Sequence, residues 1–206
     1  MQQFENLRQE VVLASQAGAV VLLLADVPDP EVARARLLSR EMSAWLAAST
    51  SLGPGRLSRS ATCGLAAVAL NAYGPIGVDV ESSVGEARLQ SALALFAHSR
   101  EVDELASQAG EGWATGLWTR KESVLKACGA GLAIPASSVR TGWRNVEWQA
   151  VQHDWLGGTL VRSVDARWPA ISISLAVAGS KAPEVLIRTL PPAVLVALQK
   201  QKSQVL

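Results

Sequence analysis

Cysteine is scarce in this sequence, and its scarcity argues against two classes of protein. The 206 residues include two cysteines, Cys63 and Cys128, which are too few for a disulfide framework. No histidine or further cysteine stands at the short spacings that zinc sites use. We therefore expect two buried free thiols.

An excess of charge of one sign is also missing. The chain has 19 basic and 18 acidic residues and a formal net charge of +1, so it lacks the basic bias of a nucleic-acid-binding protein. Lysine is rare, and the first lysine in the chain is Lys121. Cationic contacts in the first half must therefore come from arginine, whose guanidinium suits bidentate recognition of phosphate.

The sequence has neither a long apolar run nor a nucleotide-binding glycine motif. The apolar stretch at 19–25 is far shorter than the roughly 20 residues of a membrane helix. The N-terminus lacks the basic segment and cleavage site of a signal peptide, so we expect a cytoplasmic protein without membrane contact. The absence of a P-loop or a kinase-type glycine loop argues against nucleotide-hydrolysing enzymes.

Helix and strand patterns alternate along a chain that is 49% hydrophobic, enough to bury a sizeable core. Helical spacing of apolar residues predicts helices at the N-terminus, from Asp29 to Trp45, and over most of 85–128. Alternating or continuous apolar residues predict strands, at 20–24, 65–70, 76–81, 143–151, 159–164, 171–177 and 185–187.

These patterns predict an α+β protein of more than one part. The turn at 71–75 should join the strands on either side of it as a hairpin. We expect an N-terminal subdomain at 1–75, a C-terminal subdomain at 76–190, and a tail at 191–206. The tail could be a short helix or frayed, and its stretch at 195–202 carries no motif and should be solvated.

Two acidic residues share one face of the strand predicted at 76–81. Side chains alternate along a strand, so Asp79 and Glu81 project together, with Cα atoms about 6.6 Å apart. Gly77 leaves the same face uncrowded. Two carboxylates held in this way repel each other unless they share a divalent cation, and oxygen ligands favour Mg²⁺. The alternative is an edge strand whose polar face meets water.

The predicted helix that carries Trp118 offers a third acid. Trp118, Glu122 and Lys126 lie at successive helical turns and form one stripe. If this stripe faces the acidic strand, Glu122 completes a three-carboxylate site for Mg²⁺ and Lys126 can hold a phosphate oxygen, an arrangement that suits phosphoryl transfer. The alternative is a solvent-exposed Glu–Lys pair on a helix that Trp118 anchors to the core.

Together the two segments resemble the signature motifs of the Sfp-type 4′-phosphopantetheinyl transferases. The strand reads Ile-Gly-Val-Asp-Val-Glu at 76–81, and the helix reads Trp-Thr-Arg-Lys-Glu-Ser-Val-Leu-Lys at 118–126, followed by Gly-Ala-Gly-Leu. The resemblance implies two similar α/β halves related by a pseudo-twofold axis, with coenzyme A and Mg²⁺ in the cleft between them. It implies transfer of 4′-phosphopantetheine from coenzyme A to a serine of an apo acyl or peptidyl carrier protein, with release of 3′,5′-ADP.

The resemblance also assigns roles to residues. Asp79, Glu81 and Glu122 would hold Mg²⁺ against the diphosphate of coenzyme A, and Lys126 would contact the phosphates. Either Glu122 or a water on the metal would take the serine proton. The carrier would serve fatty-acid, polyketide or nonribosomal peptide biosynthesis, and the enzyme would be a monomer.

Two segments depart from the family pattern on the nucleotide side. Ser58-Arg59-Ser60 stands where the family has Ser-His-Ser, and Gly53-Pro54-Gly55 stands where it has Gly-Lys-Pro. The resemblance implies that Ser58 and Arg59 contact coenzyme A, with the arginine supplying a permanent charge for the 3′-phosphate. Arg36, or its neighbour Arg34, is close in the sequence to the position of a family arginine that contacts the nucleotide. The alternative is that both are solvated arginines on a helix.

Other residues match the family pattern loosely or not at all. Residues 96–101 resemble a family Phe-x-x-x-Glu helix entry with one extra residue, and we interpret Glu101 as a helix-start acid behind an N-cap at Ser99. His98 and His153 match nothing and are expected at the surface. Two other hypotheses stay open: a non-catalytic module that senses coenzyme A or binds a carrier protein, and a different Mg²⁺-dependent phosphotransferase or phosphatase.

Overall fold

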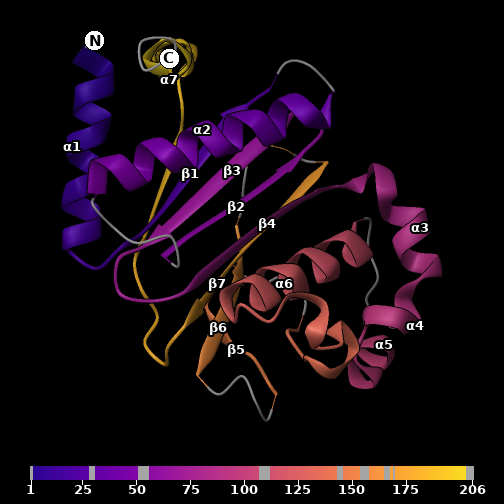
Figure 1. Ribbon diagram of the computed structural model, residues 1–206. Coiled ribbons are helices and arrows are strands. Elements are labelled where there is room, and N and C mark those ends of the chain that lie inside the picture. Colours follow the sequence, from indigo (N-terminus) through magenta and orange to yellow (C-terminus); the bar gives the residue numbers. More distant parts are fainter. Residues whose placement is uncertain are drawn as a thin grey trace. The chain divides into compact units, whose positions relative to one another are not determined.

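The computed structural model groups the chain into two compact units. One contains Met1–Gly74 together with Pro183–Leu206, and the other contains Pro75–Ala182. The structure describes residues 2–27, 31–50, 56–106, 112–142, 146–153, 158–164, 168 and 170–202. Figure 1 labels the α-helices and most of the strands of both units.

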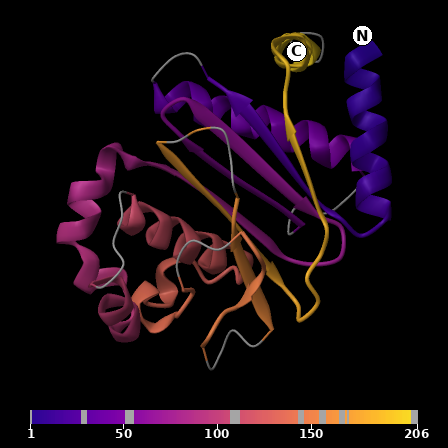
Figure 2. The same cartoon turned by 180° about the vertical axis from the view of Figure 1, so that it is seen from behind.

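The first unit is built on a sheet of order β2-β3-β1-β8. Its strands are β1 (Val20–Asp26), β2 (Leu57–Thr62), β3 (Leu65–Asn71) and β8 (Val185–Thr189). Strand β3 pairs antiparallel with both β1 and β2, whereas β8 runs parallel to β1, as can be followed in Figure 2.

Three helices share the core of this unit: α1 (Gln2–Gln16), α2 (Val32–Thr50) and α7 (Pro192–Lys202). The helical spacing of apolar residues predicted for α1 and α2 is confirmed, because the residues that carry it are buried: Phe4, Leu7 and Val11 in α1, and Ala35, Leu38, Met42 and Trp45 in α2. Asp29 and Pro30, the predicted start of the second helix, lie outside the described residues.

The C-terminal segment differs in part from the prediction. The tail from Pro191, expected as a short helix or a frayed end, forms α7. The stretch at 195–202 was expected to be solvated, but Leu198 lies with Val194 in the core of the first unit. Strand β8, which we placed within the subdomain at 76–190, pairs with β1. Strands β1 and β8 are far apart in the sequence, so local sequence patterns could not predict that they pair.

The predicted hairpin between 65–70 and 76–81 is wrong. Strand β3 pairs with β1 and β2, and the following strand belongs to the second sheet. The hairpin forms one strand earlier, with a turn at Cys63 and Gly64, where Gly64 takes a positive φ of 83°. Strand β2 escaped prediction because polar residues at 58–60 interrupt its apolar pattern. In that turn Cys63 is exposed, contrary to expectation, and Cys128 is half-buried.

The second unit has an antiparallel sheet of order β4-β7-β6-β5. Its strands are β4 (Ile76–Ser82), β5 (Gln149–Ala150), β6 (Thr159–Ser163) and β7 (Ile171–Ala178). Its α-helices are α3 (Glu86–Ser91), α4 (Leu93–Phe96), α5 (Ser99–Ala106) and α6 (Trp113–Ala127). Helix α6 packs against β4, β7 and β6, and its apolar side chains join a core with those of β6 and β7.

Gly77 sets how closely β4 approaches α6. A Cβ atom added at Gly77 would lie 1.8 Å from the carbonyl oxygen of Ser123 and 2.7 Å from the amide nitrogen of Ala127. Only a residue without a side chain fits there, because both nearby atoms belong to the helix backbone. The face of β4 that carries Gly77 therefore lies directly against α6.

Both units combine a four-stranded sheet with helices, so the predicted α+β class is confirmed. The pseudo-twofold relation and the cleft remain predictions. Among the helices in the described part of the chain, none is both long and apolar enough to cross a membrane.

Candidate active site between β4 and α6

The acidic side chains predicted on β4 lie on the face that carries Gly77. Strand alternation places Gly77, Asp79 and Glu81 on one side. Asp79 is buried, with 3% of its surface exposed, while Glu81, near the end of the strand, is half-buried. The strand therefore carries one carboxylate into the protein and presents a second one closer to its surface.

On α6, the stripe of Trp118, Glu122 and Lys126 is half-buried along its length. The indole of Trp118 packs edge-on against the ring of Phe96, with centroids 5.2 Å apart. This contact attaches α6 to α4 and confirms the predicted anchoring role of Trp118.

Lys126 reaches across to β4. Its Nζ lies 2.6 Å from Oδ1 of Asp79 and donates a second hydrogen bond, of 3.1 Å, to the carbonyl oxygen of Val78. The stripe therefore faces the acidic strand, and the alternative of a solvent-exposed Glu–Lys pair is wrong for Lys126. In the structure this ammonium group is bound to one of the acids themselves.

Glu122 lies in the same electrostatic environment. Burial raises the pKa of its carboxyl, the negative charge of Asp79 raises it further, and the positive charge of Lys126 acts in the opposite direction. Glu122 and Asp79 thus interact as like charges, although they are far apart in the sequence. The site concentrates negative charge between β4 and α6.

The chemistry of this donor set fits a hard divalent cation, which binds carboxylate oxygens. Burial and, after it, repulsion from Asp79 raise the pKa of Glu122, and such a cation would oppose both effects by favouring the ionised carboxylate. Within the described ranges, however, no three His, Cys, Asp or Glu side chains converge closely enough to hold a metal ion. The cationic group beside Asp79 in this arrangement is the ammonium of Lys126.

Two cations within the Trp-x-x-Lys-Glu motif have structural positions that the sequence analysis did not foresee. Arg120 and Lys121 are both completely buried. Arg120 donates to the carbonyl oxygens of Thr141 and Gly142, and burial lowers its pKa to about 10 although the charge of Glu101 opposes this shift. These contacts attach the segment around 141–142 to α6.

Lys121 forms a buried ion pair with Glu101, at 2.7 Å between Nζ and Oε2. It also donates to the carbonyl oxygens of Ala136 and Val139. The pair holds α5, α6 and the segment that follows α6 together, and so fixes the orientation of the helix that carries Glu122. A buried lysine can be suspected from sequence only when its acidic partner is known, and Glu101 lies 20 positions earlier.

Glu101 does more than the helix-start role we assigned to it. Its Oε2 accepts a hydrogen bond from the backbone nitrogen of His98 at 2.9 Å, and its Oε1 accepts from the backbone nitrogen of Thr141 at 2.8 Å. The cap of α5 is His98 and not Ser99, since Nδ1 of His98 accepts from the backbone nitrogen of Arg100. His98, expected at the surface, is half-buried in this role.

Glu86 caps the first turn of α6. Its carboxylate accepts hydrogen bonds from the backbone nitrogens of Ala114 and Thr115, at 3.0 and 2.9 Å. Burial alone would raise its pKa, but the hydrogen bonds from Thr115 and Ala114 lower it overall. The N-cap position of α6 is Gly112, which has no side chain, so the cap comes from another helix.

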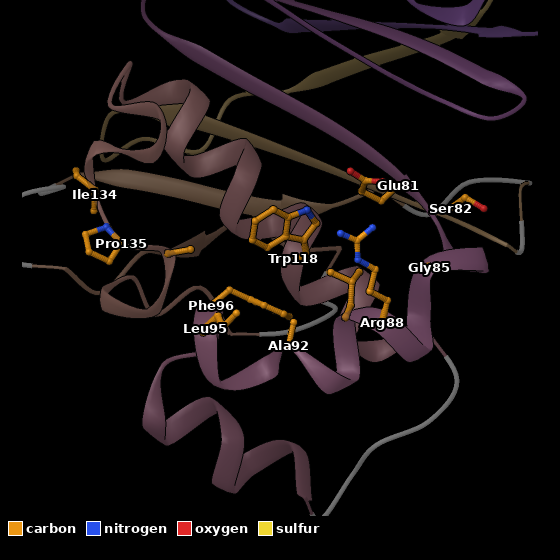
Figure 3. Close-up of a pocket in the computed structure, with 12 residues that line it drawn as sticks. Glu81, Ser82, Gly85, Arg88, Ala92, Leu95, Phe96, Trp118, Ile134 and Pro135 are labelled. Carbon is orange, nitrogen blue, oxygen red and sulfur yellow. The ribbon is translucent and has the colours of Figure 1, made fainter. Parts of the chain in front are cut away.

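A pocket of about 580 Å³ opens beside Glu81. Figure 3 shows Glu81 and Arg88 at one end, with the guanidinium of Arg88 directed toward Glu81 and the indole of Trp118 on the same side. The remainder of the wall is mostly apolar, with contributions from α3, α4 and the segment after α6 that include Leu89, Phe96 and Ile134. Glu81 therefore belongs to the acidic strand and also lines a mostly apolar pocket.

The nucleotide-side residues lie in the first unit. Arg36 is exposed on α2, and on β2 Ser58 is half-buried while Arg59 is exposed. The segment Gly53-Pro54-Gly55 lies outside the described residues. A role for Arg36, Ser58 and Arg59 in binding coenzyme A remains a proposal.

A family match covers the part of the chain that carries these residues. No curated protein matches the chain. Residues 75–174 match the family model described as the 4′-phosphopantetheinyl transferase superfamily, a range that includes β4, α6 and every residue of the acidic site. The segment of the chain at 75–174 is therefore similar to the 4′-phosphopantetheinyl transferase superfamily.

Proposed function

We propose that the protein transfers the 4′-phosphopantetheine group of coenzyme A to a serine of an apo acyl or peptidyl carrier protein and releases 3′,5′-ADP. The observation that carries the proposal is the meeting of Asp79, Glu122 and Lys126 between β4 and α6, inside the segment that matches the superfamily. Carboxylates with a lysine suit the positioning and charge neutralisation that phosphoryl transfer requires.

Asp79, Glu81 and Glu122 would hold Mg²⁺. When bound, this ion would neutralise negative charge on the diphosphate of coenzyme A. In our proposal Lys126 adds a point charge toward a phosphate oxygen, because its ammonium is flexible and already lies at the acids.

Glu122 would act as the general base. Its pKa is raised toward neutral pH. A carboxylate with a higher pKa is a stronger proton acceptor. The serine oxygen would attack the β-phosphorus, the bond from that phosphorus to the oxygen of 3′,5′-ADP would break, and the serine proton would pass to Glu122.

The phosphopantetheine arm would enter the pocket beside Glu81. A ligand whose diphosphate lies at the acidic strand would place its pantetheine chain close to this opening. The pocket volume of about 580 Å³ falls within the range of small-molecule sites. Its apolar wall suits the alkyl parts of the arm, and Arg36, Ser58 and Arg59 are the proposed contacts for the nucleotide.

The direct test is an assay with coenzyme A, Mg²⁺ and apo carrier proteins from fatty-acid, polyketide and nonribosomal peptide pathways. Mass spectrometry should show the gain of one phosphopantetheine group on the serine of at least one carrier. Folded protein that modifies none of them would contradict the proposal. Calorimetric binding of coenzyme A without any modification would favour the non-catalytic module, which the Ser58-Arg59-Ser60 departure motivates.

A further inference from the structure

The most unusual contact of the acidic site is the one between Lys126 and Asp79. The side chain of Asp79 is 4% exposed, and Nζ of Lys126 lies 2.6 Å from its Oδ1. A buried carboxylate is strongly disfavoured unless a cation compensates it. Lys126 supplies that compensation in the arrangement described above.

We propose that Lys126 is an exchangeable counter-ion, which neutralises Asp79 while no divalent cation is bound and leaves this carboxylate when one binds. The inference rests on the proposed function, because it takes Asp79 as a ligand of the cation. It adds that the same lysine has two successive partners: Asp79 first, and a phosphate oxygen after the exchange.

The two lysines of α6 differ in a way that supports this role. Lys126 is 31% exposed on its side chain, whereas Lys121 is 0% exposed and bonds to Glu101 and two carbonyl oxygens. The side chain of Lys126 can swing outward through solvent without disturbing the core, but that of Lys121 cannot. Of the two ion pairs, only Asp79–Lys126 is built to open.

The arrangement of the acids points the same way. Lys126 fills the position against Oδ1 of Asp79. A divalent cation that uses this oxygen has to replace the ammonium group, so the two cations compete for one carboxylate.

Competition predicts that removal of Lys126 strengthens metal binding. Lys126→Met should bind Mn²⁺ about tenfold more tightly than the wild-type protein in the absence of coenzyme A, since a charge-assisted hydrogen bond no longer has to break. Mn²⁺ serves as a paramagnetic probe for Mg²⁺, and its free fraction can be followed by electron paramagnetic resonance. Lys181→Met, which removes the same charge from an exposed position, is the matched control and should leave the affinity unchanged.

A second measurement follows Mg²⁺ binding in the unmodified protein, and a variant serves only to assign the resonance. With ¹⁵N-lysine, the Lys126 ammonium should give its own resonance in the metal-free protein, and the Asp79→Asn variant should lose it. Saturating Mg²⁺ should shift or broaden this resonance and leave that of Lys121 in place, because Lys121 keeps Glu101 as its partner.

The outcomes separate this inference from the function on which it rests. Equal or weaker Mn²⁺ binding by Lys126→Met, together with a Lys126 resonance that Mg²⁺ does not move, would overturn the exchange even if carrier proteins are modified normally. Tighter binding and a displaced resonance would support it. If these results came with no modification of any carrier, the exchange would stand and the transferase assignment would fail.

Discussion

At the scale of single residues, the acidic site is governed by which charges are buried and what neutralises them. Asp79 and Glu122 interact as like charges, and Lys126 opposes both. Lys121 and Glu101 neutralise each other in the interior. We propose that the first group binds a divalent cation, while the second fixes structure.

The raised pKa of Glu122 makes the stability of the metal-free protein depend on pH. The carboxyl is neutral below its ordinary pKa of 4.5 in both folded and unfolded chains, so it has no effect there. As pH rises through 4.5, the unfolded chain ionises first and stability falls, until the folded carboxyl also ionises. Glu122→Gln should therefore match the wild type near pH 4 and be more stable at pH 8.

Urea unfolding with a metal chelator present, measured over this pH range, tests that prediction. Glu104→Gln, at an exposed carboxylate that pairs with Arg140, serves as the control for a simple loss of charge. A constant difference between Glu122→Gln and wild type at all pH values would mean that the folded pKa is not raised.

The buried ion pair predicts a cost that an exposed pair does not share. Lys121→Met leaves the carboxylate of Glu101 buried without its cation and should destabilise the protein by about 3–5 kcal/mol. Arg188→Gln removes the exposed partner of Glu10 and should cost less than about 1 kcal/mol. Guanidinium-induced unfolding of both variants gives the comparison, and similar losses in the two would show that burial of the Lys121 pair is unimportant.

At the scale of elements, the site depends on the contact between β4 and α6. The strand approaches the helix backbone at Gly77, and contacts of Trp118, Arg120 and Lys121 anchor the helix further. Glu86 adds a cap at the N-terminus of α6. The acids of the strand and of the helix face each other because these contacts leave α6 little freedom to rotate.

Gly77→Ala should disrupt this contact. The new Cβ would lie 1.8 Å from a backbone oxygen that cannot move aside, so the loss should reach or exceed about 3 kcal/mol, the upper end of usual overpacking costs. Gly116→Ala is the matched control within α6, since its Cβ would approach nothing closer than 3.9 Å and alanine favours helix. Thermal unfolding should show a large decrease for the first and no decrease for the second.

At the scale of the whole molecule, the first unit is made of two distant parts of the chain. Pro183–Leu206 contributes strand β8 beside β1 and helix α7 in the core. The superfamily match ends before this segment, at residue 174. The segment Pro183–Leu206 therefore belongs to the first unit, whereas the superfamily match lies in the second.

Truncation after Ala182 tests this arrangement. It removes the β1 partner strand and the buried side chains of Leu190, Val194 and Leu198. An open β1 edge and an exposed core should make the first unit unfold or aggregate. Limited proteolysis should then cleave within 1–74 and spare 75–182; equal resistance of both segments would refute the assignment of this segment to the first unit.

Much of the site was determined by the sequence alone. The alternation of Asp79 and Glu81 and the helical stripe of Trp118, Glu122 and Lys126 follow from local geometry, which needs no distant partner. The superfamily match over 75–174 agrees with those motifs. The helices α1 and α2 were likewise predictable, because their apolar spacing reports the buried face directly.

The tertiary structure decided which partners those residues meet. It paired β3 with β2 in place of β4, brought β8 to β1, placed Lys126 on Asp79, and buried Lys121 against Glu101. Each of these contacts joins segments that could also have paired with other parts of the chain. Packing across the whole unit determines which partner each segment meets. Periodicity tells which face of an element is buried, but only the folded chain determines what that face is buried against.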